Sequence, residues 1–105
     1  MDADQAYIFR VIFEWDPEKN ETIKRERGVS FEEIALHLGE GRLWAVTKHW
    51  NPTKYPNQRI FLIPIGGQIF AVPFVQENET FFLKTAFASR KMTKRYRDEQ
   101  HDENA

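Results

Sequence analysis

Apolar and polar positions alternate along the chain in a way that separates short apolar strands from polar segments with helix signals. Stretches rich in β-branched and aromatic residues predict strands over residues 7–15, 43–50, 59–65 and 68–75. A fifth strand is predicted over 80–88, where alternation places Lys84 on the face opposite Thr85 and Phe87. Gly66 and Gly67 stand between two of these strands and predict a two-residue hairpin turn, because glycine tolerates positive φ.

Prolines fall inside the two most apolar of these strands. Because proline has no N–H to donate to a neighbouring strand, Pro64 and Pro73 should each lie at an edge, a strand end or a bulge. The near-continuous apolar runs around them indicate that much of the sheet is covered on both faces, with a helix pair on one side.

The polar segment 16–39 carries the start and stop signals of two helices. Asp16 can accept from the free N–H groups of a helix that begins at Pro17, and Gly28 supplies the left-handed residue that ends it. Ser30 opens an S-x-x-E capping box for a second helix, with Gly39 as its expected stop. The sequence therefore predicts two short helices that meet at a tight corner.

A third helix is predicted after Ser89, where Met92 and Tyr96 stand four residues apart. Its first turns are strongly cationic, which opposes the helix dipole. Either an anion or an acidic partner offsets this cost, or the helix begins later, at Thr93. Residues 1–6 and 98–105 are expected to be frayed. The order of strand, two helices, antiparallel meander and terminal helix predicts one α+β domain over residues 1–105.

Composition limits the classes of protein that this chain can be. Its 105 residues, 41% of them hydrophobic, suffice for one modest core. The absence of cysteine excludes disulfides, thiolate catalysis and Cys-based zinc sites, and the three histidines are scattered, so we expect neither metal nor cofactor. No apolar run has the length of a membrane span, and the first residues lack the features of a signal peptide, so a cytoplasmic location is expected.

The net charge of −1 conceals a segregation of charge along the chain. Residues 46–97 contain nine basic and two acidic residues, a net charge of +7, whereas residues 1–45 and 98–105 each carry −4. Such a cationic segment can bind a polyanion through contacts with its phosphates, or it can be an ordinary solvated surface.

The segment FEWDPEKNETIKRERGVSFEEIA at residues 13–35 resembles the BrnT family of bacterial toxins. The resemblance continues through YPNQRIFLI, VPFV and FLKTAFASRKMTK, and it covers residues 13–97. It implies a RelE-like fold and the ribonuclease of a type II toxin–antitoxin pair. It also implies a small ribbon-helix-helix antitoxin as partner, with DNA contacted only through the complex. The family usually carries Lys-His before the corner glycine, whereas this chain has Glu26 and Arg27.

Cleavage of RNA without a metal needs a base, an acid and fixed cations that stabilise the phosphorane. Lys84, Arg59 and Arg90 are expected to converge in one concave cationic patch, although Lys84 could instead face solvent. His49, the one histidine of the cationic segment, is the candidate for proton transfer; alternatively it is a strand-end histidine bonded to a loop carbonyl. The resemblance implies a further alternative, in which Lys84 and Arg90 carry the reaction and His49 shapes the pocket.

Aromatic and cationic residues near the loop 51–57 are candidates for contact with RNA. The expected RNA-binding residues are Lys48, Tyr55, Arg27 and Lys91. Tyr55 and Trp50 can stack on unpaired bases or pack in the core. Three hypotheses therefore stand: a toxin endoribonuclease, a non-catalytic RNA- or ribosome-binding module, and a degenerate toxin-like protein that only docks a partner.

Overall fold

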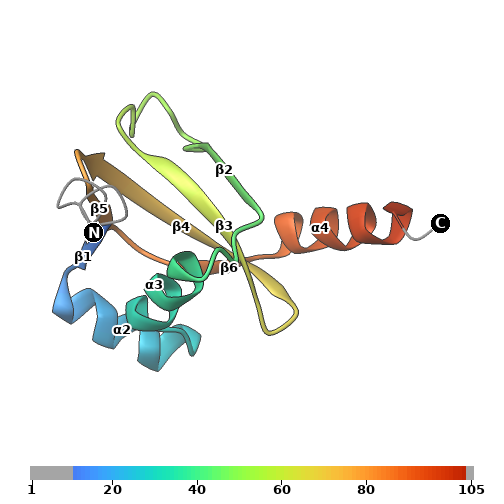
Figure 1. Cartoon of the computed structure of the whole chain (residues 1–105), viewed down its shortest axis with the longest axis horizontal. Coiled ribbons are helices and arrows are strands. Elements are labelled where there is room, and N and C mark those ends of the chain that lie inside the picture. The colour runs from blue at the N-terminus through green and yellow to red at the C-terminus, as the bar shows by residue number, and fades with distance from the viewer. Residues whose placement is uncertain (1–10, 104–105) are drawn as a thin grey trace, which may run out of the picture.

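A mixed α+β architecture surrounds one central sheet (Figure 1). The computed structural model describes residues 11–103, with side chains through residue 100. The strands are β1 (Ile12–Trp15), β2 (Ala45–Lys48), β3 (Arg59–Ile65), β4 (Gln68–Glu77), β5 (Thr80–Leu83) and β6 (Phe87–Ser89). The helices are α2 (Pro17–Arg27), α3 (Phe31–Gly39) and α4 (Arg90–Glu103). The predicted α+β class is confirmed.

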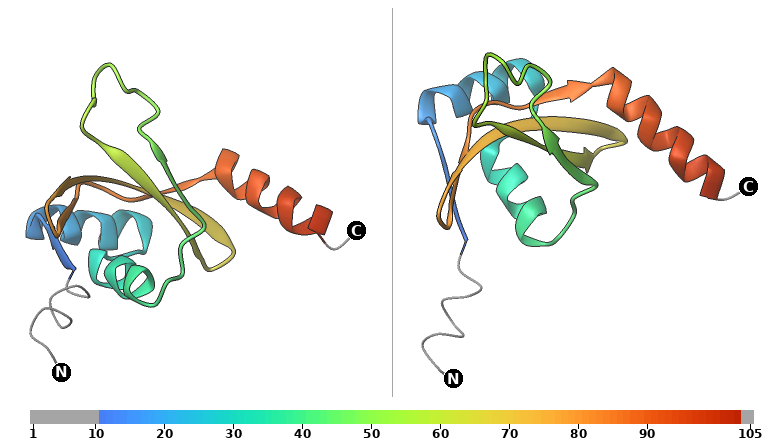
Figure 2. Two further views of the ribbon diagram at one scale, coloured as in Figure 1. Left: turned by 45° about the horizontal axis from the view of Figure 1, so that its top comes forward. Right: turned by 90° about the horizontal axis from the view of Figure 1, so that it is seen from above.

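The sheet has the strand order β1-β5-β4-β3-β2, and β6 also pairs with β4. Strands β2 to β6 pair antiparallel, which confirms the predicted meander, and β1 joins the edge parallel to β5. Of the strand predicted over residues 7–15, β1 is the regular part, and residues 7–10 lie outside the described residues. In Figure 2, α2 and α3 lie together near β1, whereas α4 extends away from the sheet at the other end.

Local signals fix the corner between α2 and α3 as predicted. The Asp16 carboxylate accepts from the backbone N–H of Glu18 at 3.0 Å, and Gly28 ends α2 with a φ of 66°. The Ser30 hydroxyl accepts from the N–H of Glu33 at 3.0 Å and opens α3. Gly39 is the last residue of α3, as expected for its stop.

A buried asparagine joins the two helices. Asn20 is only 4% exposed, and its side-chain oxygen accepts from the backbone N–H of Phe31 at 2.8 Å. Its amide group donates to the Glu32 carboxylate at 2.7 Å. This hydrogen bond is the largest cause that lowers the pKa of Glu32, and the charge of Lys24 adds to the effect. One side chain therefore sets the start of α3 against the middle of α2.

Apolar clusters cover both faces of the sheet, as the strand pattern predicts. On the face toward α2 and α3, Phe61 and its neighbours pack against residues of the helix pair such as Ile23 and Phe31. On the other face, Ile60 and its neighbours pack against Met92 of α4, with Tyr96 alongside. Because α4 extends away from the sheet, it covers only part of this second face (Figure 2).

The predicted strand over 80–88 is wrong at its centre, where the chain bulges opposite Pro73. Leu83 pairs with Phe74, and Phe87 pairs with Ala71. The chain therefore advances four residues from Leu83 to Phe87 while β4 advances only three, so this segment has one extra residue. Pro73 has no N–H for the ladder, and its carbonyl accepts from the N–H of Lys84 at 2.8 Å. The extra residue reverses the alternation, so that Phe87 lies on the face opposite Leu83.

The other expected turns follow their local signals. Gly66 and Gly67 adopt φ of 59° and 81° and form the tight hairpin between β3 and β4. Pro64 pairs with Ile69 on β4, but β2 pairs with β3 only as far as Leu62. The missing N–H of Pro64 therefore costs no hydrogen bond between β3 and β2, as expected for a position at the edge of the sheet.

Helix α4 begins at Arg90, so the alternative start at Thr93 is wrong. The Ser89 hydroxyl accepts from the N–H of Met92 at 3.1 Å, which caps the helix. The buried Thr93 hydroxyl donates to the Ser89 carbonyl at 2.6 Å and accepts from the N–H of Ile69 at 2.8 Å, tying α4 to β4. The helix continues to Glu103, through most of the segment expected to fray.

Candidate functional site

A hollow of about 350 Å³ lies beside the bulge, and we call it the Lys84 hollow. Its lining residues are His49, Trp50, Tyr55, Gln58, Ile60, Pro73, Lys84, Thr85 and Phe87. The bulge creates it, because Lys84, Thr85 and Phe87 now contribute to one lining instead of two faces. The Lys84 ammonium lies 4.9 Å from the ring centroid of Phe82, and none of the described residues that line the hollow has a carboxylate. The hollow thus presents a cation among aromatic rings.

His49 and Tyr55 lie together in the Lys84 hollow, with their ring centroids 4.5 Å apart. The backbone N–H of Asn51 donates to Nδ1 of His49 at 3.0 Å. An accepting Nδ1 places the proton of the neutral ring on Nε2. The expected bond to a loop carbonyl is therefore wrong, because the ring accepts from the loop instead. In this state His49 offers a donor to a ligand through Nε2–H.

Arg27 supports the bulge from the end of α2. Its guanidinium donates to the carbonyl of Ala86 at 2.7 Å and to the hydroxyl of Thr85 at 3.0 Å. Thr85 lines the Lys84 hollow, so Arg27 lies next to the hollow with these two donors already engaged by the protein. The residue expected to bind RNA is in the first place a positioning residue for the segment that carries Lys84.

Arg59 does not face the Lys84 hollow, contrary to expectation. It pairs across the sheet with Phe74, and its guanidinium carbon lies 5.2 Å from that ring, on the face toward α2 and α3. Its Nη2 also donates to the side chain of Gln76 at 2.8 Å. Lys48 stands directly opposite Arg59 on β2 and shares its face. Strand alternation therefore turns both cations away from the hollow, which is lined by the next residue, Ile60.

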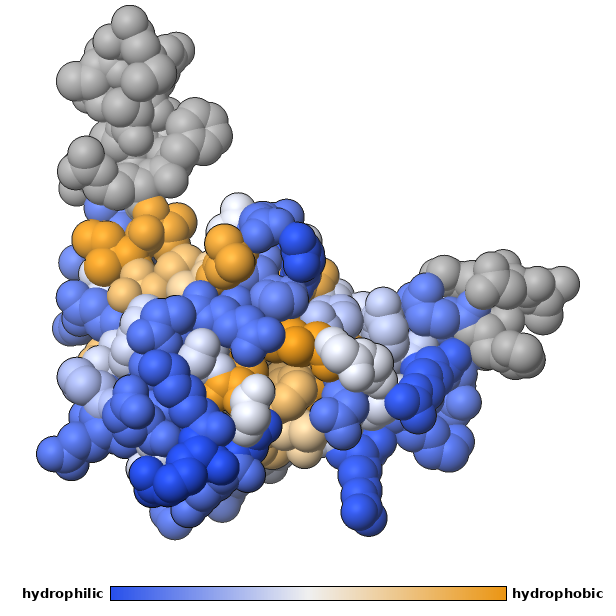
Figure 3. Space-filling view, turned by 90° about the horizontal axis from the view of Figure 1, so that it is seen from below, coloured by the Kyte–Doolittle hydropathy of each residue, from blue (hydrophilic) through white to orange (hydrophobic). Residues whose placement is uncertain are grey.

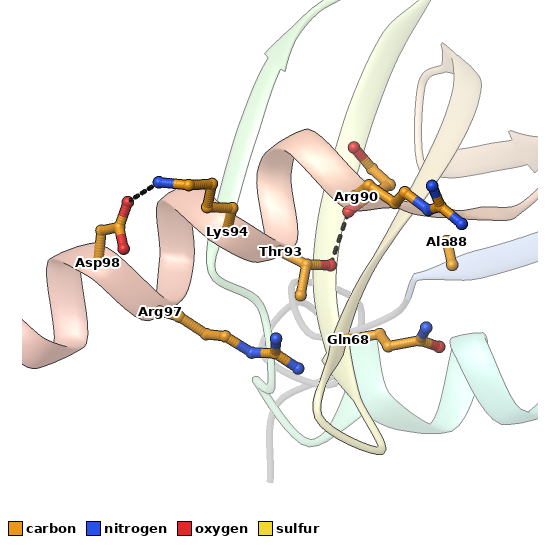
Figure 4. Close-up of a pocket in the computed structure, with 8 residues that line it drawn as sticks. Gln68, Ala88, Arg90, Thr93, Lys94, Arg97 and Asp98 are labelled. Carbon is orange, nitrogen blue, oxygen red and sulfur yellow. Dashed lines mark hydrogen bonds and ion pairs between the residues drawn. The ribbon is translucent and has the colours of Figure 1, made fainter.

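Arg90 lines a different hollow, of about 340 Å³, between the start of α4 and the β3–β4 turn (Figure 4). Lys94 turns away toward Asp98, with which it pairs at 2.9 Å, and this hydrogen bond raises the pKa of Lys94. Arg97 donates to the carbonyl of Gly67 at 2.9 Å. None of the residues that line this hollow lines the Lys84 hollow. The expected single patch of Lys84, Arg59 and Arg90 is therefore wrong.

A groove of about 530 Å³ between β2 and α4 adjoins the Lys84 hollow, and we call it the β2–α4 groove. Its lining residues are Trp44, Ala45, Thr47, Trp50, Leu62, Lys91, Met92, Arg95 and Glu99. Trp50 belongs to both linings and is 49% exposed. Sequence reasoning named Lys91 and Trp50 but missed Trp44 and Arg95. The spacing of Arg95 four residues after Lys91 was the signal that could have found it.

A third surface is apolar and lies between β1 and α3. It is lined by Val11, Phe13, Leu38, Gly39, Leu43, Phe61 and Phe81. Figure 3 shows one group of apolar side chains at an edge of the molecule, and further apolar side chains near the middle of the same view, among hydrophilic ones. Among the described residues, no polar side chain lines this surface, so these residues offer it no group for acid–base chemistry or anion binding.

Comparison of the chain with protein-family models, with curated proteins and with solved structures gave no match in any of the three. Within residues 11–103, no three His, Cys, Asp or Glu residues lie close enough together to hold a metal ion. The helices in this same part of the chain are too short or too polar to cross a membrane. The functional site must therefore be identified from the side chains of the chain itself.

Proposed function

We propose that this chain is an endoribonuclease that needs no metal and acts as the toxin of a type II toxin–antitoxin pair, with a RelE-like fold. The order of a strand, two helices, an antiparallel meander and a terminal helix is what the BrnT resemblance implies. The observation that carries the proposal is the Lys84 hollow, where this lysine meets His49 and Tyr55, which lie far from it in the sequence.

The groups of the Lys84 hollow suit a phosphodiester. Lys84 has no hydrogen bond or ion pair from its ammonium group among the described residues, so this cation is available to a phosphate. Such a charge stabilises the phosphorane as it forms, the step in which fixed cations are most effective. Under this proposal the 2′-hydroxyl oxygen attacks phosphorus and gives its proton to water, while His49 donates from Nε2 to a phosphate oxygen. The bond to the 5′-oxygen breaks as the Tyr55 phenol protonates that oxygen, and Tyr55 then regains a proton from water. Because the described part of the chain contributes no carboxylate to its lining, the hollow resembles an anion site more than a site for a divalent cation.

The decisive experiment incubates purified protein with a defined RNA in EDTA and measures both cleavage and the 2′,3′-cyclic phosphate end. We expect Lys84→Ala to slow cleavage by roughly 10²-fold or more, the effect typical of losing one group that stabilises a developing oxyanion. Lys24→Ala is the matched control, since this lysine of α2 makes only exposed ion pairs. Equal cleavage by both variants would remove Lys84 from the reaction. If the wild-type protein does not cleave the RNA, the proposed ribonuclease activity is rejected.

The hydrogen bond from Asn51 to His49 favours a second candidate, a non-catalytic RNA-binding module. To accept a proton at Nε2, the neutral ring of His49 must carry its own proton on Nδ1, and it then loses the hydrogen bond from Asn51. The separation of Arg59 and Arg90 from Lys84 also leaves fewer cations for catalysis than expected. Strong salt-dependent binding of RNA that stays uncut in EDTA and in Mg²⁺ would favour this second function.

A toxin needs a neutralising partner, and the resemblance implies a small ribbon-helix-helix antitoxin. In the cytoplasm this antitoxin would block the access of RNA to the toxin. Under this proposal the antitoxin covers the cationic face, and only the complex contacts DNA. Expression of the chain alone should arrest growth, and Lys84→Ala should relieve the arrest at an equal protein level. Persistent arrest by the variant would show that the toxicity has another origin.

A further inference from the structure

The β2–α4 groove continues the Lys84 hollow on the same face of the sheet, with Trp50 shared between them. Its cations are Lys91 and Arg95, which are one helical turn apart, about 6 Å along α4. Lys91 has no ion pair among the described residues, and Arg95 lies 3.6 Å from the exposed carboxylate of Glu99. Two cations thus face one carboxylate, which leaves the groove positive.

Trp50 stands where the hollow and the groove meet. Its ring packs edge-on against Phe87 with centroids 6.0 Å apart, while 49% of the residue remains exposed. Trp44 lies further along the groove, where it packs edge-on against Tyr96 at 5.1 Å. A T-shaped contact covers at most one face of the indole, and 49% of Trp50 remains exposed, so a flat ring can stack on Trp50.

We infer that the β2–α4 groove binds a single-stranded flank of the RNA whose reacting phosphate lies in the Lys84 hollow. One unpaired base stacks on Trp50, and Lys91 and Arg95 bind the phosphates that follow. This inference rests on the proposed function, because it requires RNA in the Lys84 hollow. A duplex cannot enter in this way, since its bases are stacked on one another and their faces are hidden.

The test separates binding from cleavage by using a short, fluorescently labelled 2′-fluoro oligoribonucleotide, which lacks the 2′-hydroxyl nucleophile. Its affinity is measured by anisotropy over a series of salt concentrations. We expect Trp50→Ala to weaken binding roughly 5- to 150-fold, as for other bases stacked on aromatic side chains. We expect Lys91→Ala to lower the slope of log affinity against log salt by about 0.7, the value for one phosphate contact with a single strand.

Lys94→Ala is the matched control for Lys91→Ala. It removes the same kind of side chain from the same helix, but Lys94 lines the separate hollow that contains Arg90, and it pairs with Asp98. Trp50→Phe should restore most of the affinity lost in Trp50→Ala, because phenylalanine keeps a stacking face. Thermal melting of each variant separates lost contacts from lost folding.

Several outcomes would overturn the inference. These are equal salt slopes for the Lys91 and Lys94 variants, wild-type affinity in Trp50→Ala, or binding of a duplex as tight as that of the single strand. Capture of an acidic peptide in place of RNA, weakened by Lys91→Ala, would also overturn it and make the groove a protein-docking surface. Failure of the proposed enzyme activity gives a different result. RNA that binds tightly, in a way that depends on Trp50, but stays uncut would reject the enzyme and keep the assignment of the groove.

Discussion

The tie that Asn20 makes between α2 and α3 leads to a quantitative prediction for Asn20→Ala. The variant leaves the N–H of Phe31 without a partner at a buried position, a loss of about 1–3 kcal/mol. The second bond, to Glu32, contributes less, because the Glu32 side chain is 57% exposed and water can replace the amide. We expect the free energy of unfolding to fall by about 2 kcal/mol in total.

The assay is equilibrium unfolding in urea, with melting as a second measure. For a domain of this size we expect the melting temperature to fall by roughly 10 °C, with an unchanged dependence of the free energy on urea concentration. Glu32→Gln is the matched control, since it keeps an oxygen for the Asn20 amide and leaves the Phe31 bond intact. A loss in Asn20→Ala no larger than in Glu32→Gln would refute the reasoning that the buried N–H dominates.

The same tie predicts a dependence on pH. The pKa of Glu32 is lowered in the folded protein, chiefly by the hydrogen bond from Asn20, from an ordinary value of 4.5. A lowered pKa gives stability that is present above pH 4.5 and is lost as the pH falls through the lower, folded value. The difference between the wild type and Glu32→Gln should therefore narrow in acid. A difference that stays constant from neutral pH to pH 3 would contradict this assignment.

Two further variants test how the sheet holds the candidate site. Arg27→Ala should lower the free energy of unfolding by about 1–2 kcal/mol, because it removes the hydrogen bonds that hold the bulge beside Lys84. The variant should also cleave RNA more slowly. Melting checks the first effect and the cleavage assay in EDTA the second, and unchanged cleavage would show that Arg27 does not position Lys84. Thr93→Val should cost about 1–3 kcal/mol by leaving the N–H of Ile69 unpaired, and amide exchange should quicken at Ile69, whereas Thr93→Ser should keep most of the protection.

The helices and the hairpin could be predicted because their signals are local. Asp16, Gly28 and Ser30 each act within one helical turn, and Gly66 with Gly67 needs only its own backbone freedom. The Asn20 tie could not be predicted in this way, since it depends on how two helices pack. The general rule is that a residue whose partner lies within four positions can be recognised without knowing the fold.

The candidate site was predicted less well, because it depends on register. Whether Arg59 or Ile60 faces the hollow is decided by a shift of a single residue, and nothing near Arg59 in the sequence fixes that shift. The bulge opposite Pro73 then reversed the alternation through which Lys84 and Thr85 had been assigned to opposite faces. The meeting of Lys84, His49 and Tyr55 in one lining was nevertheless within reach, since all three had been singled out for their chemistry.

The bulge has a consequence for how such a hollow can change in evolution. Its position is dictated by an imino acid on the adjoining strand, which contributes little chemistry of its own. An exchange of Pro73 for a residue with an N–H would allow regular pairing to resume at this point. Lys84 could then leave the lining that it shares with its aromatic neighbours. Loss of the proposed activity in a descendant would thus require no alteration of any reactive group, only the restoration of one hydrogen bond in the ladder.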